Sequence, residues 1–246
     1  MRFFIELSFN GGCYHGWQIQ PNVNTVQKEL NRAFSTILNE DIELVGAGRT
    51  DAGVHAKQMF AHFDFNEIID LEKLISQVNG FLSNDIVIHN VFNVEEDAHA
   101  RFDAISRTYQ YFITNKKSPF DINRYFFYKT LDVNAMNTGC KYLLGKQDFT
   151  SFSKVHTQTY TNDCNLMFAV WEEKEDSLVF TIKADRFLRN MVRAVVGTLL
   201  DVGEGKIKPE DIIEIIAKKD RSEAGISAPA HALFLTNIEY PKSYNF

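Results

Sequence analysis

This sequence has few cysteines, no long apolar run and fewer basic than acidic residues. Its three cysteines, Cys13, Cys140 and Cys164, are odd in number and form no C-x-x-C pair, so neither a disulfide framework nor a cysteine-based zinc site is expected. The seven histidines show no H-E-x-x-H or comparable spacing, and we therefore expect no metal site. No segment has the length and apolarity of a membrane span, and a strand-like pattern begins at Arg2 without the regions of a signal peptide. These absences predict a cytoplasmic protein.

Acidic residues outnumber basic ones, and the net charge is −6 at pH 7. This argues only weakly against a nucleic-acid partner, because phosphates need basic residues only on the face that meets them. Arg186, Arg189 and Arg193 have helical spacing, which predicts that they line one side of a helix whose other sides are apolar. A basic stripe in a cleft and a solvated charged face are both compatible with Arg186 and Arg189. Arg193 lies within the apolar stretch, so we expect it to have a partly buried partner.

The loop Gly46–Ala56 combines three glycines with one carboxylate and one guanidinium. Glycines permit tight bends and a close approach of a substrate to the backbone, while Asp51 projects from a segment with little core of its own. Arg49 lies two residues before Asp51, and an opposite charge nearby favours the ionised carboxylate. An ionised carboxylate suits a nucleophile or a general base. A simple turn with an Asp that caps backbone amides is the alternative for an isolated loop of this kind.

Hydrophobic periodicity predicts an α+β fold with two halves of similar composition. The first half is predicted to contain two helices and four strands in a ferredoxin-like order: Arg2–Phe9, Val26–Leu38 (helix), Ile42–Val45, Met59–Phe65, Leu71–Phe81 (helix) and Ile86–Val94. The second half is predicted to contain strands and helices at Ile105–Thr114, Tyr125–Tyr128, Val133–Leu144 (helix), Leu166–Glu172, Leu178–Ala184, the helix with the three arginines, Pro209–Ala217 (helix) and Phe234–Tyr240.

No Pro-rich or Gly/Ser-rich linker separates the two halves. We therefore expect an N-terminal subdomain, residues 1–103, which carries the Asp51 loop, and a C-terminal subdomain, residues 104–246, which completes the active site. They are predicted to share a continuous, mostly antiparallel sheet, with the active-site cleft between them. Within residues 153–165, the polar stretch Lys154–Asn162 is interpreted as a mobile loop and as a candidate RNA contact.

Residues Ala47–His55 resemble the catalytic signature of the tRNA pseudouridine synthase A family. Further segments are similar to that family in the same order, namely Gly16–Gln20, His99–Ala104, Arg107–Tyr111, Asp148–Phe152, Met191–Gly197, Ala228–Pro229 and Leu233. An ordered set that spans nearly the whole chain is far more specific than any one motif. The resemblance implies two RRM-like subdomains, a tRNA partner and a homodimer whose joint surface holds one tRNA.

The activity that this resemblance implies is the isomerisation of uridine to pseudouridine in the anticodon stem-loop of tRNA, at positions 38 to 40. Asp51 would be the nucleophile that attacks the ribose or the base. The resemblance also gives Arg193 a place in the active site, where it and Arg49 would hold Asp51 ionised and anchor the phosphate of the flipped nucleotide. Tyr109 would stack on the flipped base or carry a proton, and Leu233 would form the opposite wall. The reaction involves no redox change, so no nicotinamide, flavin or metal cofactor is expected.

The chain departs from the family at Ala232, where relatives usually have glycine, and at Asn10, which replaces an aspartate. Arg186 and Arg189 are included as substrate-binding candidates. Two other classes of function compete with an isomerase. A catalytically silent RNA-binding module would have lost Asp51 or its arginine, and both are present. An unrelated hydrolase with an aspartate nucleophile would usually need a second positioned acid or a metal cluster, and the sequence offers neither.

Overall fold

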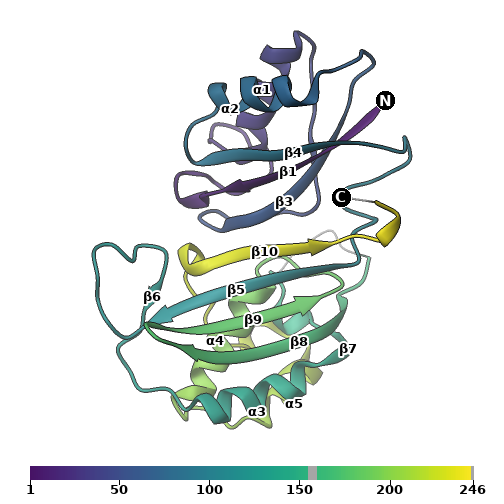
Figure 1. Cartoon of the computed structure of the whole chain (residues 1–246). Coiled ribbons are helices and arrows are strands. Elements are labelled where there is room, and N and C mark those ends of the chain that lie inside the picture. The colour runs from purple at the N-terminus through teal and green to yellow at the C-terminus, as the bar shows by residue number, and fades with distance from the viewer. Residues whose placement is uncertain (155–159, 245–246) are drawn as a thin grey trace. The chain divides into compact units, whose positions relative to one another are not determined.

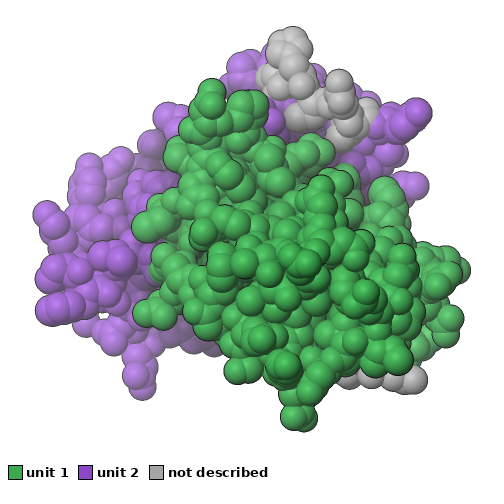
Figure 2. Space-filling model, turned by 90° about the horizontal axis from the view of Figure 1, so that it is seen from above, with its two compact units in different colours: residues 1–105, 235–246 green, residues 106–234 purple. Residues whose placement is uncertain are grey.

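The computed structural model describes residues 1–154 and 160–244, and the chain forms two compact units. The first unit consists of Met1–Ile105 with Leu235–Phe246, and the second of Ser106–Phe234 (Figure 2). This differs from the predicted division because the C-terminal segment returns to the first unit. Its backbone and side chains are bonded there: the Ile105 amide donates to the Glu239 carbonyl (2.7 Å) and the Tyr240 hydroxyl to the Ala100 carbonyl (2.5 Å).

The first unit is a sheet with two helices on one face (Figure 1). Its elements are β1 (Arg2–Phe9), α1 (Val26–Leu38), β2 (Val45–Gly46), β3 (His55–Asp64), α2 (Leu71–Phe81), β4 (Ile86–Val94) and β10 (Leu233–Glu239) from its third residue on. The strand order is β4-β1-β3-β10, with β1 antiparallel to both β3 and β4. The short β2 lies outside this order and pairs antiparallel with one end of β3. The buried side of α1 carries Val26, Leu30, Ala33 and Phe34, spaced as an amphipathic helix requires.

The second unit is also a sheet covered by helices (Figure 1). Its elements are β5 (Ser106–Thr114), β6 (Tyr125–Phe126), α3 (Val133–Leu143), β7 (Gly145–Asp148), β8 (Asp163–Lys174), β9 (Ser177–Ala184), α4 (Met191–Gly203) and α5 (Asp211–Lys218). The order is β5-β9-β8-β7 with antiparallel pairs, and the short β6 runs parallel to β5. Nearly every residue of α4 is buried, so this helix forms the centre of the core.

The predicted α+β class is confirmed, and four elements have the predicted bounds: β1, α1, α2 and β4. The predicted strand Ile42–Val45 is wrong for its first three residues. There the backbone bonds to side chains of α1 instead of to a strand. Ser35 Oγ accepts from the Ile42 amide (2.9 Å), Asn31 Oδ1 accepts from the Leu44 amide (3.1 Å), and Gln27 Nε2 donates to the Leu44 carbonyl (2.7 Å). In addition, no helix among the described residues is long and apolar enough to cross a membrane.

Candidate active site

Asp51 lies in a tight turn between β2 and β3, and it is half-buried. The Asp51 carbonyl accepts from the Val54 amide (3.1 Å), which closes the turn. Gly53 occupies the left-handed region with φ 80°, a conformation that favours glycine. Its amide donates to the Tyr14 carbonyl (3.2 Å), so the turn is attached to the segment that follows β1.

A second segment, around Gly16 and Trp17, supports the residue just before Asp51. The Trp17 amide donates to the Thr50 carbonyl (3.3 Å). A Cβ on Gly16 would lie 2.3 Å from the Thr50 carbonyl oxygen, and Gly16 has φ 86°. Likewise, a Cβ on Gly46 would lie 2.4 Å from the indole ring of Trp17. Both approaches require glycine, because no side chain fits between these atoms.

The residues after Asp51 are held by the turn at Gly11. The Gly11 amide donates to Nδ1 of His55 (3.0 Å), and His55 is buried. That imidazole nitrogen is therefore unprotonated, and His55 has a structural role here. A Cβ on Gly11 would lie 1.9 Å from the Val54 carbonyl oxygen. The backbone on both sides of Asp51 is thus fixed by glycines that lie far away in the sequence.

Arg49 lies two residues before Asp51, and its side chain is exposed. Within the described part of the chain, Arg49 forms no ion pair with Asp51. The idea that Arg49 holds the carboxylate ionised therefore stays a prediction. An exposed guanidinium beside the turn is available for contact with a large substrate.

Tyr109 belongs to the second unit and lies on β5, opposite Ile182 of β9. Its ring packs edge-on against Phe187, with 5.2 Å between ring centroids. Tyr111 is two residues further along and so projects from the same face of the strand. It is fully buried, its hydroxyl donates to the Pro229 carbonyl (2.9 Å), and burial raises its pKa far above the ordinary value. Through Tyr111, the strand that carries Tyr109 is bonded to the segment around Pro229.

Arg193 lies on α4 and is bonded to that same segment. Its Nε donates to the Ala228 carbonyl (2.7 Å), and its own carbonyl accepts from the Ala228 amide (3.0 Å). One turn further along α4, a Cβ on Gly197 would lie 1.7 Å from the Ile226 carbonyl oxygen. The chain from Ile226 to Ala228 therefore lies directly on the helix, in contact with its backbone.

Leu233 follows this segment at the start of β10 and is buried, as is Ala232 before it. The residues from Ala228 to Leu233 thus connect three predicted site elements of the second unit: the helix of Arg193, the strand of Tyr109 and the wall residue Leu233. The sequence motif includes Ala228 and Pro229, but it does not predict that their carbonyls accept hydrogen bonds from Arg193 and Tyr111.

Arg186 and Arg189 do not lie on one helix face with Arg193, and this prediction is wrong. The helix begins only at Met191, after Asn190, which has φ 68°. Before the helix, the Asp185 carboxylate accepts hydrogen bonds from the backbone amides of Arg186 (2.7 Å) and Asn165 (2.8 Å), and these bonds hold the chain in a loop. Such side-chain acceptors compete with helical hydrogen bonds. Arg186 is half-buried and Arg189 exposed in that loop.

Two further predictions concern the polar loop and the thiols. The central part of the predicted RNA-contacting loop, residues 155–159, lies outside the described residues.

Cys140 and Cys164 are buried, and burial raises the pKa of each thiol to about 12, whereas Cys13 is exposed. Within residues 1–154 and 160–244, no group of three His, Cys, Asp or Glu side chains is arranged to hold a metal ion.

Comparison with known proteins gives consistent similarities. Residues 140–241 match the model of the family described as tRNA pseudouridine synthase. The chain is 51% identical to tRNA pseudouridine synthase A of Bacteroides thetaiotaomicron, covering 98% of this chain and 91% of the relative. It is 52% identical to the protein of the same name from Bacteroides fragilis, covering 98% and 97%. The corresponding protein of Aliivibrio salmonicida is 41% identical, covering 100% of this chain and 95% of the relative.

Proposed function

This chain belongs to the tRNA pseudouridine synthase A family, and we propose that Asp51 is the nucleophile with which it isomerises uridine to pseudouridine in the anticodon stem-loop of tRNA. The observation that carries the proposal is the position of Asp51. Its carboxylate lies half-buried on a turn whose backbone is fixed by Gly11, Gly16 and Gly53, and a fixed nucleophile lowers the entropic cost of attack.

The reaction needs a group that bonds covalently while the base changes its point of attachment. In the first step the Asp51 carboxylate forms a bond to the ribose or to the base, and the bond between N1 and C1′ breaks. The uracil then rotates, C5 bonds to C1′, and the bond to Asp51 breaks. The proton on C5 leaves and N1 gains a proton, so the product is an isomer of the substrate and Asp51 is regenerated.

Tyr109, Leu233, Arg193 and Arg49 are proposed to act on the same nucleotide. The Tyr109 ring would stack on the flipped uracil and its hydroxyl would take the C5 proton, while Leu233 would cover the opposite face of the base. Arg193 would bind the phosphate or the Asp51 carboxylate through the guanidinium nitrogens beyond Nε, since Nε itself donates to Ala228. The exposed Arg49 would contact the displaced nucleotide.

The finer assignments follow from the family. The modified uridines are proposed to be those at positions 38 to 40, in tRNAs of the cytoplasm. The protein is proposed to work as a homodimer that holds one tRNA across both subunits. Light scattering of the protein alone and with tRNA tests the dimer, and mapping pseudouridines in tRNA from cells with and without the protein tests the positions.

The direct test of the nucleophile is Asp51→Asn, which keeps the size of the side chain and removes its charge. We expect no pseudouridine in a tRNA transcript treated with this variant, with circular dichroism and tRNA affinity close to those of the unsubstituted protein. Asp41→Asn serves as the matched control, because it makes the same change at an exposed aspartate outside the turn. Measurable pseudouridine formation by Asp51→Asn would refute the proposed role of Asp51.

A further inference from the structure

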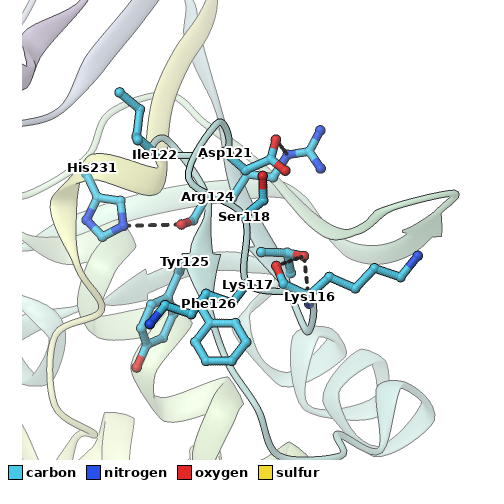
Figure 3. A pocket seen from close by; sticks show the side chains of 10 residues that line it. Lys116, Lys117, Ser118, Asp121, Ile122, Arg124, Tyr125, Phe126 and His231 are labelled. Carbon is cyan, nitrogen blue, oxygen red and sulfur yellow. Dashed lines mark hydrogen bonds and ion pairs between the residues drawn. The ribbon is translucent and has the colours of Figure 1, made fainter.

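The second unit contains a pocket of about 330 Å³ where β5 and β6 end (Figure 3). Its lining comes from the end of β5, from β6, from the connection between these two strands, and from His231, which precedes β10. Most of the residues that line it are charged or polar, namely Thr114, Lys116, Lys117, Ser118, Asp121, Arg124 and His231. Tyr125 and Phe126 add aromatic surface. This composition is typical of a site for part of a nucleic acid, where cations meet phosphate and rings meet bases.

Cations outnumber carboxylates in this lining, although the whole chain has a net charge of −6. Lys116 pairs with Asp176 at 3.3 Å, and these side chains are 75% and 64% exposed. Arg124 Nε lies 3.6 Å from the carboxylate of Asp121 (Figure 3). A solvent-exposed pair such as Lys116–Asp176 contributes about 0–1 kcal/mol, so a phosphate can replace its carboxylate at little cost. Among the described residues, Lys117 forms no ion pair.

Aromatic side chains lie in and beside the pocket. Phe126 lines it and is 41% exposed, while the nearby Phe120 and Tyr128 are 92% and 76% exposed. Exposed rings cost free energy in water unless a partner covers them. Stacking of one base on such a ring contributes roughly 1–3 kcal/mol, whatever the base. The pocket therefore offers both kinds of contact that single-stranded RNA uses.

The pocket is joined to the segment that carries the proposed uracil wall. Nε2 of His231 lies 3.3 Å from the Arg124 carbonyl oxygen, as the dashed line in Figure 3 indicates. His231 belongs to the short 3-10 turn Ala230–Ala232, and Leu233 follows directly. Tyr125 also packs edge-on against Tyr111, with 6.5 Å between ring centroids. Because His231 lines the pocket and lies two residues before Leu233, an RNA strand whose flipped uridine packs against Leu233 would have a neighbouring nucleotide close to this pocket.

We propose that this pocket binds a nucleotide of the tRNA adjacent to the flipped uridine. The phosphate would lie among Lys116, Lys117 and Arg124, and the base would stack on the exposed ring of Phe126. This proposal rests on the proposed function, because it takes the substrate to be an anticodon stem-loop. The pocket would then contribute affinity, while the chemistry would remain with Asp51.

The test measures binding of a tRNA transcript that contains the target uridine, at several salt concentrations, in the Asp51→Asn background so that no turnover occurs. Lys117→Glu should weaken binding tenfold or more, and Lys116→Ala with Lys117→Ala should lower the salt slope by about 1–2, since each lost phosphate contact removes about one unit. Lys117→Arg, which keeps the positive charge, should bind the tRNA as tightly as the protein with Lys117. Lys141→Glu is the matched control, because it makes the same charge change at an exposed lysine on α3.

Equal effects of Lys117→Glu and Lys141→Glu would overturn the proposal. The proposal would also be overturned if Lys117→Glu left tRNA affinity unchanged and altered the oligomeric state on size exclusion. The pocket would then belong to a protein interface. Either result leaves the nucleophile untouched. Conversely, pseudouridine formation by Asp51→Asn would refute the role of Asp51, while the affinities would still decide whether the pocket binds RNA.

Discussion

Replacing Gly16 with alanine should slow catalysis without a change in any residue that touches the substrate. Gly16 has φ 86°, and an alanine there costs roughly 1–2 kcal/mol in backbone strain. The new Cβ would lie 2.3 Å from the Thr50 carbonyl oxygen. Because such contacts are not tolerated below about 3 Å, the peptide that joins Thr50 to Asp51 must move by roughly 0.7 Å or more.

A displacement of this size is large for a nucleophile. A misplacement of about 1 Å in an active site costs about 10²-fold in rate, which corresponds to about 2.7 kcal/mol of transition-state stabilisation. We therefore expect Gly16→Ala to lower kcat about 100-fold. The free energy of unfolding should fall by only about 1–3 kcal/mol, since the fold around the turn can relax.

The assay compares Gly16→Ala with Gly12→Ala, which changes a glycine in the adjacent turn. A Cβ on Gly12 meets only the side-chain oxygen of Asn10, at 3.1 Å, and Gly12 has no positive φ. Single-turnover pseudouridine formation with saturating enzyme isolates the chemical step, and urea denaturation gives the stability of each variant. Wild-type kcat for a folded Gly16→Ala protein would refute the argument that this glycine positions Asp51.

Three further results are expected. Arg193→Ala should cost far more activity than Arg186→Ala, because Arg193 is anchored on Ala228 whereas Arg186 lies in a loop. Equal losses of activity, with equal changes in the salt slope of tRNA binding, would mean that both arginines only contact the phosphate backbone of the tRNA. Tyr109→Phe should bind tRNA yet lose most turnover, and near-normal single-turnover rates would leave Tyr109 only a stacking role. Burial, followed by the Arg2 charge, lowers the pKa of His62 from 6.5 to about 4. The contribution of neutral His62 to the free energy of unfolding should therefore be complete above about pH 6.5 and fall towards pH 4, because the unfolded chain takes up the proton first. Urea unfolding at about pH 6.5 and about pH 4 should show a smaller difference in that free energy for His62→Asn than for the unsubstituted protein.

Elements with a clear hydrophobic period were predictable from the sequence. The helices α1 and α2 begin after Thr25 and the capping Asp70, and their buried residues recur at helical spacing. The strand β7 was not predicted, because Gly145–Asp148 contains no alternation of apolar and polar residues. It forms through backbone pairing with β8, which supplies the neighbouring edge. Periodicity predicts elements that bury a side-chain face and misses those that only complete a ladder.

The candidate site was predictable in part for a similar reason. The composition of the loop around Asp51 indicated a reactive carboxylate, and the motif match indicated Tyr109, Arg193 and Leu233 as partners. The contacts that hold these residues were not predictable, since they join segments far apart in the chain. Val54 meets Gly11, and Ile226 meets Gly197, through backbone atoms that carry no sequence signal of their own. The arginine spacing misled for the opposite reason, because a local carboxylate acceptor overrode a helical pattern.

A reactive carboxylate creates a conflict that backbone contacts resolve. As the proposed nucleophile, Asp51 would have to stay reachable by a large substrate, so its loop could not be fixed by burying large side chains around it. The loop is fixed through amides and carbonyls instead, and such contacts need partners without a Cβ, as at Gly11 and Gly16. The same arrangement recurs at Gly197, where the chain beyond Ile226 lies on α4 and supplies the carbonyl that orients Arg193. Support through backbone atoms and glycines adds no side-chain bulk beside the proposed reactive groups, and catalysis on a displaced nucleotide would need that room.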